Sequence, residues 1–388
     1  MQIRLPRLDG GIETLNLKAQ PLRPEGPTKP FNRVVYAAAH VVIDPFALAD
    51  PWDASPAVDW DATLAFREHL YGLGFKVAEA MDTAQRGMGV DWPVARELIQ
   101  RSLRHARAVG GEAGCGVGTD QLEPGPGVGL ADVERAYREQ LEVVEREGGT
   151  AILMASRALA RCARGAEDYL ALYGRLLRDA QRPVVLHWLG KMFDPQLEGY
   201  WGTTDIATAL ETVLRLIEAH ADKVEGIKVS LLDAQWEIAL RRRLPKHVKM
   251  FTGDDFNYAE LIEGDEDGFS HGLLGIFDPI APVAALALGE LARGDAARYR
   301  ALMDPTVALS RELFRAPTRH YKAGVVFLAW LNGHQKHFSM AGGLQSARGV
   351  AHYARVFELA DACGVLVDPE LACDRMRRYL GVTCGIDA

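Results

Sequence analysis

The sequence lacks any long uninterrupted apolar segment. No run approaches the ~20 apolar residues that a membrane-spanning helix needs, and the opening residues, MQIRLPRLDGG, lack the apolar stretch of a signal peptide. Cysteine is scarce as well, with five among 388 residues and no CxxC pair. These absences argue against a membrane protein and against a disulfide framework, and they predict a cytoplasmic protein with reduced thiols.

The sequence also has fewer basic than acidic residues. Lysine and arginine number 44 against 52 aspartates and glutamates, a formal net charge of −8, which argues against a nucleic-acid-binding surface. The glycine-rich run GCGVGTDQLEPGPGVG fits the dinucleotide motif GxGxxG in no frame, and the chain has neither H-x-H nor H-E-x-x-H. The sequence therefore predicts no cofactor, no bound metal, no nucleic-acid partner and no membrane partner.

What the sequence does have is a regular alternation. From Phe31 onward, short apolar segments alternate with longer segments of helical period, which is typical of repeated βα units. Eight such repeats over roughly 250 residues match the usual size of a (β/α)8 TIM barrel, whereas a doubly wound sheet would need fewer strands. The predicted strands are residues 33–40, 75–80, 114–118, 150–155, 183–188, 224–230, 248–253 and 268–276.

The two ends of the chain do not follow this alternation. Residues 1–32 form a predicted N-terminal extension, a hairpin turning at Asp9-Gly10-Gly11 and followed by a proline-rich linker. The barrel is predicted over 33–294. Residues 295–388 show helical patterns without strands and are predicted to form a C-terminal helical cap.

The barrel hypothesis selects candidate site residues before any family is considered. Active sites of such barrels lie where the strands end and the following loops begin. Chemically capable residues at those positions are His40, Glu79, Asp82, Thr83, Thr119, Arg157, His187, Lys228, Asp254, Asp255, Ser270 and His271.

Lys228 is the most informative of these residues. It lies within the apolar strand-like run GIKVS, and the strands of a barrel have packed side chains inside and helices outside, so neither face offers water freely. Burial lowers the pKa of a lysine and leaves a neutral amine that can attack a carbonyl carbon. Lys228 is therefore predicted to be a Schiff-base nucleophile; the alternative is a strand-end lysine paired with Asp254 or Asp255.

The segment around Lys228, VEGIKVSLLD, resembles the sixth-strand motif of the dihydrodipicolinate synthase and N-acetylneuraminate lyase family of class I aldolases. The resemblance spans roughly residues 33–333 and implies a TIM barrel, an imine on Lys228 and a homodimer or homotetramer. Further segments resemble family motifs in the same order: GVG at 116–118, GDD at 253–255, DGFSHGLLGIFDP at 267–279 and GD at 294–295.

Three positions depart from the family pattern. His187 stands where the family has a proton-relaying tyrosine, and a histidine can relay protons too; the alternative is a core histidine. Thr83 keeps a hydroxyl of the carboxylate-binding loop, but Asp82 adds a negative charge that disfavours a pyruvate-like carboxylate. Asp82 would suit the hydroxyls of a sugar-derived compound, or else it caps a helix near Asp91. Arg157 could clamp a carboxylate or phosphate, or form a surface salt bridge.

The expected protein is a Schiff-base-forming lyase, aldolase or dehydratase of carbohydrate metabolism that acts on a small, sugar-derived carbonyl compound. Its catalytic residues would be Lys228 and His187. The predicted substrate-binding residues are Asp82, Thr83, Thr119, Arg157, Asp254, Asp255, Ser270 and His271.

Two other functions stay open. One is a metal-dependent aldolase or isomerase, in which carboxylates and histidines at the strand ends hold a divalent ion that polarises the carbonyl. Its ligands would come from Asp82, His187, Asp254, Asp255 and His271, with His40 and Glu79. The other is a sugar-binding barrel without catalysis.

Overall fold

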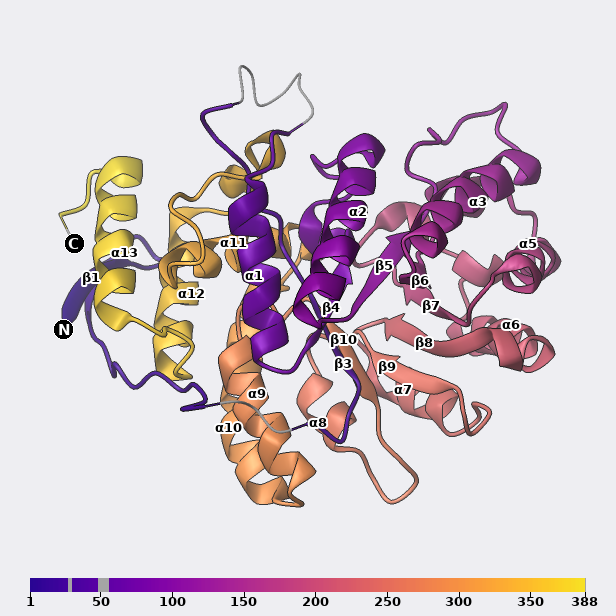
Figure 1. The fold of residues 1–388 in the computed structure, drawn as a ribbon. Helices are drawn as coiled ribbons and strands as arrows, with labels where there is room; N and C mark the ends of the chain where they lie inside the picture. The colour runs from indigo at the N-terminus through magenta and orange to yellow at the C-terminus, as the bar shows by residue number, and fades with distance from the viewer. Residues whose placement is uncertain (27–29, 48–55, 388) are drawn as a thin grey trace.

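The predicted (β/α)8 barrel is confirmed by the computed structural model, which describes residues 1–26, 30–47 and 56–387 (Figure 1). Residues 27–29 of the predicted linker, and 48–55 and 388, lie outside the described residues. Parallel strands close into a barrel in the order β10-β3-β4-β5-β6-β7-β8-β9. The barrel strands are β3 (Val35–Ala38), β4 (Lys76–Glu79), β5 (Ala113–Val117), β6 (Thr150–Leu153), β7 (Val184–Leu189), β8 (Val224–Ser230), β9 (Lys249–Thr252) and β10 (His271–Leu274).

Helices follow each barrel strand and cover the outside of the barrel (Figure 1). Aspartates cap several of them; the Asp91 side chain, for example, accepts the backbone N–H of Val94 at 3.1 Å and begins α2. The helices of the barrel are α1 (Trp60–Gly72), α2 (Trp92–Val109), α3 (Leu130–Arg146), α4 (Arg157–Cys162), α5 (Ala166–Asp179), α6 (Ile206–Ala219), α7 (Ala234–Arg241), α8 (Tyr258–Glu263) and α9 (Ala281–Ala292).

Four further helices form the C-terminal helical region, as predicted. Among the residues described, none of the helices is both long enough and apolar enough to cross a membrane. The C-terminal helices are α10 (Ala296–Leu313), α11 (Tyr321–Leu331), α12 (Val350–Ala362) and α13 (Pro369–Cys384).

Alternating side chains of the strands fill the barrel interior. Tyr36, Ile152, Phe251 and Leu273 belong to one buried apolar cluster, and successive residues of a strand point to opposite faces. On β8 this alternation directs Lys228 inward, since its neighbours Ile227 and Val229 pack in the larger cluster between the strands and the helices. The interior is therefore a packed core.

The N-terminal hairpin is confirmed, and it packs on the C-terminal helices. Its strands are β1 (Gln2–Pro6) and β2 (Ile12–Asn16). Arg7 Nη1 lies 2.7 Å from Glu358 Oε2 on α12, and the Asp361 carboxylate accepts the backbone N–H groups of Lys18 (2.7 Å) and Ala19 (3.0 Å). Figure 1 shows both termini on the same side of the molecule. The two ends of the chain thus build one unit.

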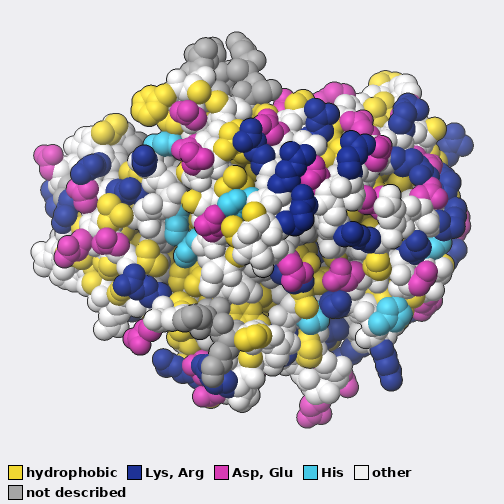
Figure 2. Space-filling view, viewed as in Figure 1, with side chains coloured by type: hydrophobic (Ala, Val, Ile, Leu, Met, Phe, Trp, Pro, Cys, Tyr) yellow, Lys and Arg dark blue, Asp and Glu magenta, His cyan; other side chains and the backbone are white. Residues whose placement is uncertain are grey.

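Exposed charges lie interspersed on the face drawn in Figure 2, where lysines and arginines alternate with acidic side chains over α2 and α3. Many of them pair: Arg138 contacts Glu134 at 2.7 Å on α3, and Arg104 of α2 contacts Glu147 at 2.5 Å. Exposed pairs of this kind contribute roughly 0–1 kcal/mol each to stability, so they affect solubility more than folding.

Candidate active site

Three adjoining cavities lie at the carboxyl ends of the barrel strands. Asp82 and Leu189 line all three, so the cavities form one cleft. The hydroxyl chamber, about 180 Å³, contains Thr119 and Ser156. The cationic chamber, about 310 Å³, contains Arg157, Arg319 and Lys322. The lysine chamber, about 10 Å³, contains Lys228, Asp255, Thr83 and Tyr321.

Lys228 reaches the lysine chamber from inside the barrel. Its side chain is buried, with 8% of its surface exposed. Gly253 makes room for it, because a Cβ on Gly253 would lie 2.6 Å from Lys228 Cε and 2.2 Å from Ser230 Oγ. Within the part of the chain that the structure describes, the Lys228 amine has neither a hydrogen bond nor an ion pair at 4.0 Å or less. The amine is therefore available to a ligand in the chamber.

Burial shifts the protonation of Lys228 and Asp255 in opposite directions. Loss of hydration lowers the pKa of Lys228, although the charges of Asp255 and Asp82 oppose the shift. Loss of hydration also raises the pKa of Asp255, although its Oδ1 accepts the Ile276 N–H at 2.9 Å. Both shifts favour a neutral amine beside a protonated carboxyl group, which is the state a nucleophilic lysine needs.

His187 lies on β7 directly beside Lys228 in the strand register and lines the hydroxyl chamber. Its Nε2 is 3.3 Å from Ser230 Oγ, while Nδ1 is buried without a hydrogen-bond partner among the described residues. Burial, and secondarily the charge of Lys228, hold the pKa of His187 well below 6.5. The ring is therefore neutral near pH 7 and accepts a proton poorly.

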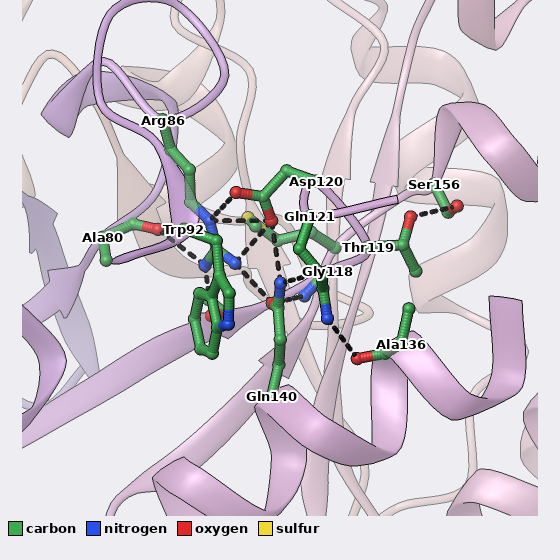
Figure 3. Close-up of polar contacts among 12 residues, drawn as sticks. Ala80, Arg86, Trp92, Gly118, Thr119, Asp120, Gln121, Ala136, Gln140 and Ser156 are labelled. Atoms are coloured by element: carbon green, nitrogen blue, oxygen red, sulfur yellow. Dashed lines mark hydrogen bonds and ion pairs between the residues drawn. The ribbon is translucent and has the colours of Figure 1, made fainter. Parts of the chain in front are cut away.

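The hydroxyl chamber has a rigid wall built on Arg86 (Figure 3). The Arg86 guanidinium donates to the Asp120 carboxylate and to Gln140 Oε1, and it lies 5.2 Å from the Trp92 ring centre. These contacts join the loops after β4 and β5. Next to them, Thr119 Oγ1 lies 2.6 Å from Ser156 Oγ, so two hydroxyls face the cavity together.

Lys322 of α11 faces the cationic chamber, and sequence reasoning missed it. Its side chain is 3% exposed; Nζ donates to the Arg319 carbonyl at 3.0 Å and lies 3.2 Å from Met88 Sδ. Burial lowers the pKa of Lys322 to about 8, although the charge of Asp82 opposes the shift. No local signal marks Lys322, because YKAGVVFLAWL reads only as an apolar helix.

The structure brings together most of the predicted site residues. Asp82 opens a 3₁₀ turn (Asp82–Ala84) and does not cap α2, since Asp91 does so. Arg157 lines the cleft and also pairs with Asp194. Thr83 Oγ1 lies 2.8 Å from Tyr321 OH. The predicted residues that line the cleft are Asp82, Thr83, Thr119, Arg157, His187, Lys228 and Asp255.

Three predicted substrate-binding residues lie elsewhere. Asp254 accepts the backbone N–H groups of Phe256 (2.9 Å) and Asn257 (3.0 Å), so it closes a turn. The prediction for Ser270 and His271 is wrong in position, because β10 begins only at His271 and both residues therefore lie at the amino-terminal end of the barrel. Ser270 Oγ donates to Glu237 Oε1 at 2.6 Å, and His271 Nδ1 accepts the Val34 N–H at 2.9 Å.

The ligands proposed for a metal are dispersed. His40 Nδ1 lies 2.8 Å from Asp278 Oδ2, and both carboxylate oxygens of Glu79 accept from Arg67 at 2.9 Å. No group of three or more His, Cys, Asp or Glu side chains that could hold a metal ion occurs among the residues described. The metal-dependent alternative therefore has no ligand set in this part of the chain.

The fold defines the class to which the protein belongs. Solved structures with the same fold include a dihydrodipicolinate synthase from Aquifex aeolicus, at 12% identity and a TM-score of 0.64 over 87% of this chain and 99% of that one. The synthase from Acinetobacter baumannii, complexed with pyruvate, matches at 15% identity with a TM-score of 0.61, over 86% of this chain and 99% of that one. A putative dihydrodipicolinate synthase family protein from Coccidioides immitis matches at 14% identity with a TM-score of 0.56, over 94% of this chain and 99% of that one. The resemblance to this family is confirmed at the level of the fold.

A family model covers nearly the whole chain. A family model described as a protein of unknown function (DUF993) matches residues 3–386, and the chain belongs to this family. A search of curated proteins gives no match. The family model spans the hairpin, the barrel and the C-terminal helices alike.

Proposed function

We propose that the protein is a Schiff-base-forming lyase that acts on a small hydroxylated carbonyl compound through Lys228. The observation that carries the proposal is the buried Lys228 amine, which faces a cavity and has no ion pair among the described residues. The neutral amine would attack the carbonyl carbon, and loss of water would give an iminium ion. In a retro-aldol cleavage the iminium would take up the electron pair of the Cα–Cβ bond as it breaks, while a base removes the proton of the β-hydroxyl group. In a dehydration it would take up the electron pair of the Cα–H bond as a base removes the α-proton, and the resulting enamine would expel the β-hydroxyl group, which leaves as water with a proton from an acid.

The solved structures support this chemistry indirectly. The Acinetobacter baumannii synthase, which has the same fold, is described as complexed with pyruvate, a small carbonyl compound. Pyruvate itself is a poorer fit to this chain, since its carboxylate would lie in the lysine chamber, where Asp82 would repel it at close range and Lys228 is the only lysine or arginine among the described lining residues. Asp82 and the hydroxyls of Thr119 and Ser156 instead favour a substrate rich in hydroxyl groups, as expected for carbohydrate metabolism.

Proton transfer would fall to Asp255 more than to His187. A general acid or base works best when its pKa lies near the working pH. Burial raises the pKa of Asp255 toward neutrality and lowers that of His187 far below it. In this proposal Asp255 holds the proton that the amine and the departing water need. His187 would then orient the substrate through a hydrogen bond from its neutral ring.

The experiment that tests the proposal is reductive trapping. The protein is incubated with dihydroxyacetone, glyceraldehyde or pyruvate, borohydride is added, and intact and peptide masses are measured. The expected result is one adduct, located on Lys228 and absent from the Lys228→Arg protein. Lys191→Arg, which changes an exposed lysine that lines a separate cavity, is the matched control and keeps the adduct.

Two outcomes would contradict the proposal. An adduct that persists in Lys228→Arg, or that maps to Lys322, would move the nucleophile to another residue. Absence of any adduct, together with full activity of Lys228→Ala on an identified substrate, would remove the imine mechanism altogether.

A further inference from the structure

The cationic chamber contains a buried charge that the described residues do not neutralise. Lys322 is 3% exposed, yet its amine donates only to a backbone carbonyl and a sulfur, lies 4.9 Å from the Tyr321 ring centre, and has no ion pair within the described ranges. Burial of an unpaired ammonium group costs several kcal/mol. A folded protein retains such a group where a ligand supplies the opposite charge.

The surroundings of Lys322 also favour an anionic ligand. Arg157 lines the same chamber from the start of α4, and Arg319 lines it from the turn just before α11, three residues ahead of Lys322. Arg157 reaches Asp194 through Nε alone, and Arg319 has no ion pair in the part of the chain described. These cations therefore reach the chamber from two segments of the chain, and among the described residues neither Asp82 nor Asp194, the carboxylates that line it, forms an ion pair with Lys322 or Arg319.

We propose that the cationic chamber binds a phosphate group of the substrate while the carbonyl carbon of the same molecule reacts at Lys228. The inference rests on the proposed function and names its substrate class, a phosphorylated hydroxy-carbonyl compound. Asp82 lines both chambers and would accept hydrogen bonds from the hydroxyl groups between the two ends of the molecule. The order carbonyl, hydroxyl, phosphate thus matches the order Lys228, Asp82, Lys322.

Phosphate fits the chamber better than a carboxylate does. A phosphate monoester has three terminal oxygens and a charge of about −1.5 to −2 at neutral pH, so it can engage donors from three directions. A carboxylate is planar, with two oxygens and one charge. The chamber is also the largest of the three, about 310 Å³.

Calorimetric titration with inorganic phosphate tests the inference without a turnover assay. Wild-type protein is expected to bind phosphate. Lys322→Met and Arg157→Gln are each expected to weaken binding by about tenfold or more, because each removes a charge-assisted contact. Lys228→Met leaves the cationic chamber intact and is expected to bind phosphate as the wild type does, so a failed imine mechanism would not affect this result. Thermal melting checks that each variant is folded.

Acetate at the same ionic strength is the competing ligand. Weaker binding of acetate than of phosphate supports the inference. Three results would overturn it: no phosphate binding by the wild type, equal affinities in the wild type and both charge-removing variants, or acetate binding as tightly as phosphate. Should Lys322→Met fail to fold, Arg157→Gln and Arg319→Gln decide the question, since both residues are exposed.

Discussion

At the scale of single residues, Gly253 determines whether Lys228 can reach its chamber. Glycine at this position leaves the space through which the side chains of Lys228 and Ser230 pass. Any larger residue has to displace one of them, and neither has an alternative path through a packed barrel interior. The glycine is therefore as much a part of the site as the lysine.

Gly253→Ala is expected to reduce reductive labelling of Lys228 strongly and to lower the free energy of unfolding by about 1–3 kcal/mol, the usual cost of overpacking. Peptide mass mapping and urea unfolding measure the two effects. Gly72→Ala is the matched control, because nothing lies within 4 Å of a Cβ at that helical position. Unchanged labelling in Gly253→Ala would show that the amine reaches the chamber by another route.

The pH dependence of labelling is a second prediction at this scale. The neutral amine is the reactive form, so the labelling rate should rise with pH. Because burial lowers the pKa of Lys228 from its ordinary value of 10.5, the rate should reach half of its maximum below pH 10.5. Asp255 favours the charged amine, so Asp255→Asn should move the midpoint lower still. Rates of mass gain at a series of pH values provide the measurement. A midpoint at or above 10.5 contradicts the assignment.

At the scale of elements, Glu237 joins α7 to the residue just before β10, because the Ser270 hydroxyl donates to its carboxylate. Burial raises the pKa of Glu237 from 4.5 to about 8, so the folded state holds a proton that the unfolded state releases. The stabilising contribution is complete below about pH 4.5 and is lost as the pH rises toward 8.

Glu237→Gln removes this dependence. The free energy of unfolding of the wild type should therefore fall relative to that of the variant between pH 5 and pH 8, measured by urea unfolding. Glu260→Gln, which removes an exposed carboxylate from the neighbouring α8, controls for the loss of one charge. A constant difference between wild type and Glu237→Gln across this range would contradict the buried, protonated state.

The sequence predicted elements better than it predicted side-chain directions. β8 occupies the predicted residues 224–230, where Val224, Ile227 and Val229 favour a strand. The last strand was predicted over residues 268–276, whereas β10 covers only His271–Leu274. Ser270 and His271 lie in the first half even of the predicted strand, so the strand bounds themselves argued against placing them at the carboxyl end. Asp254 and Asp255 are adjacent, and only the observed backbone decides which one faces Lys228. Lys322 was not predicted, since it lies on a C-terminal helix outside the predicted barrel, and the strand ends that form the rest of the cleft are distant in the chain.

At the scale of the whole molecule, the hairpin and the C-terminal helices stabilise each other. Asp361 is buried and accepts two backbone N–H groups from the segment after β2. Asp361→Ala should lower the free energy of unfolding by about 1–3 kcal/mol and should make residues 17–20 sensitive to limited proteolysis. Asp374→Ala, in an exposed i,i+4 pair on α13, is the control. Full protease resistance of Asp361→Ala would mean that apolar packing alone holds the hairpin.

The assembly state stays a prediction. The family resemblance implies a homodimer or homotetramer, and light scattering coupled to size-exclusion chromatography tests it directly. A monomer at micromolar concentration would show that this family does not share that property.

The packing of the hairpin on α12 also has a consequence for synthesis on the ribosome. The contact from Lys18 to Asp361 joins residues 343 positions apart, and at 5–20 residues per second roughly 17–70 s separate their translation. During that interval the apolar side chains Ile3 and Leu5, buried in the finished protein, have no helix to cover them. The hairpin can therefore reach its final packing only after α12 has been synthesised.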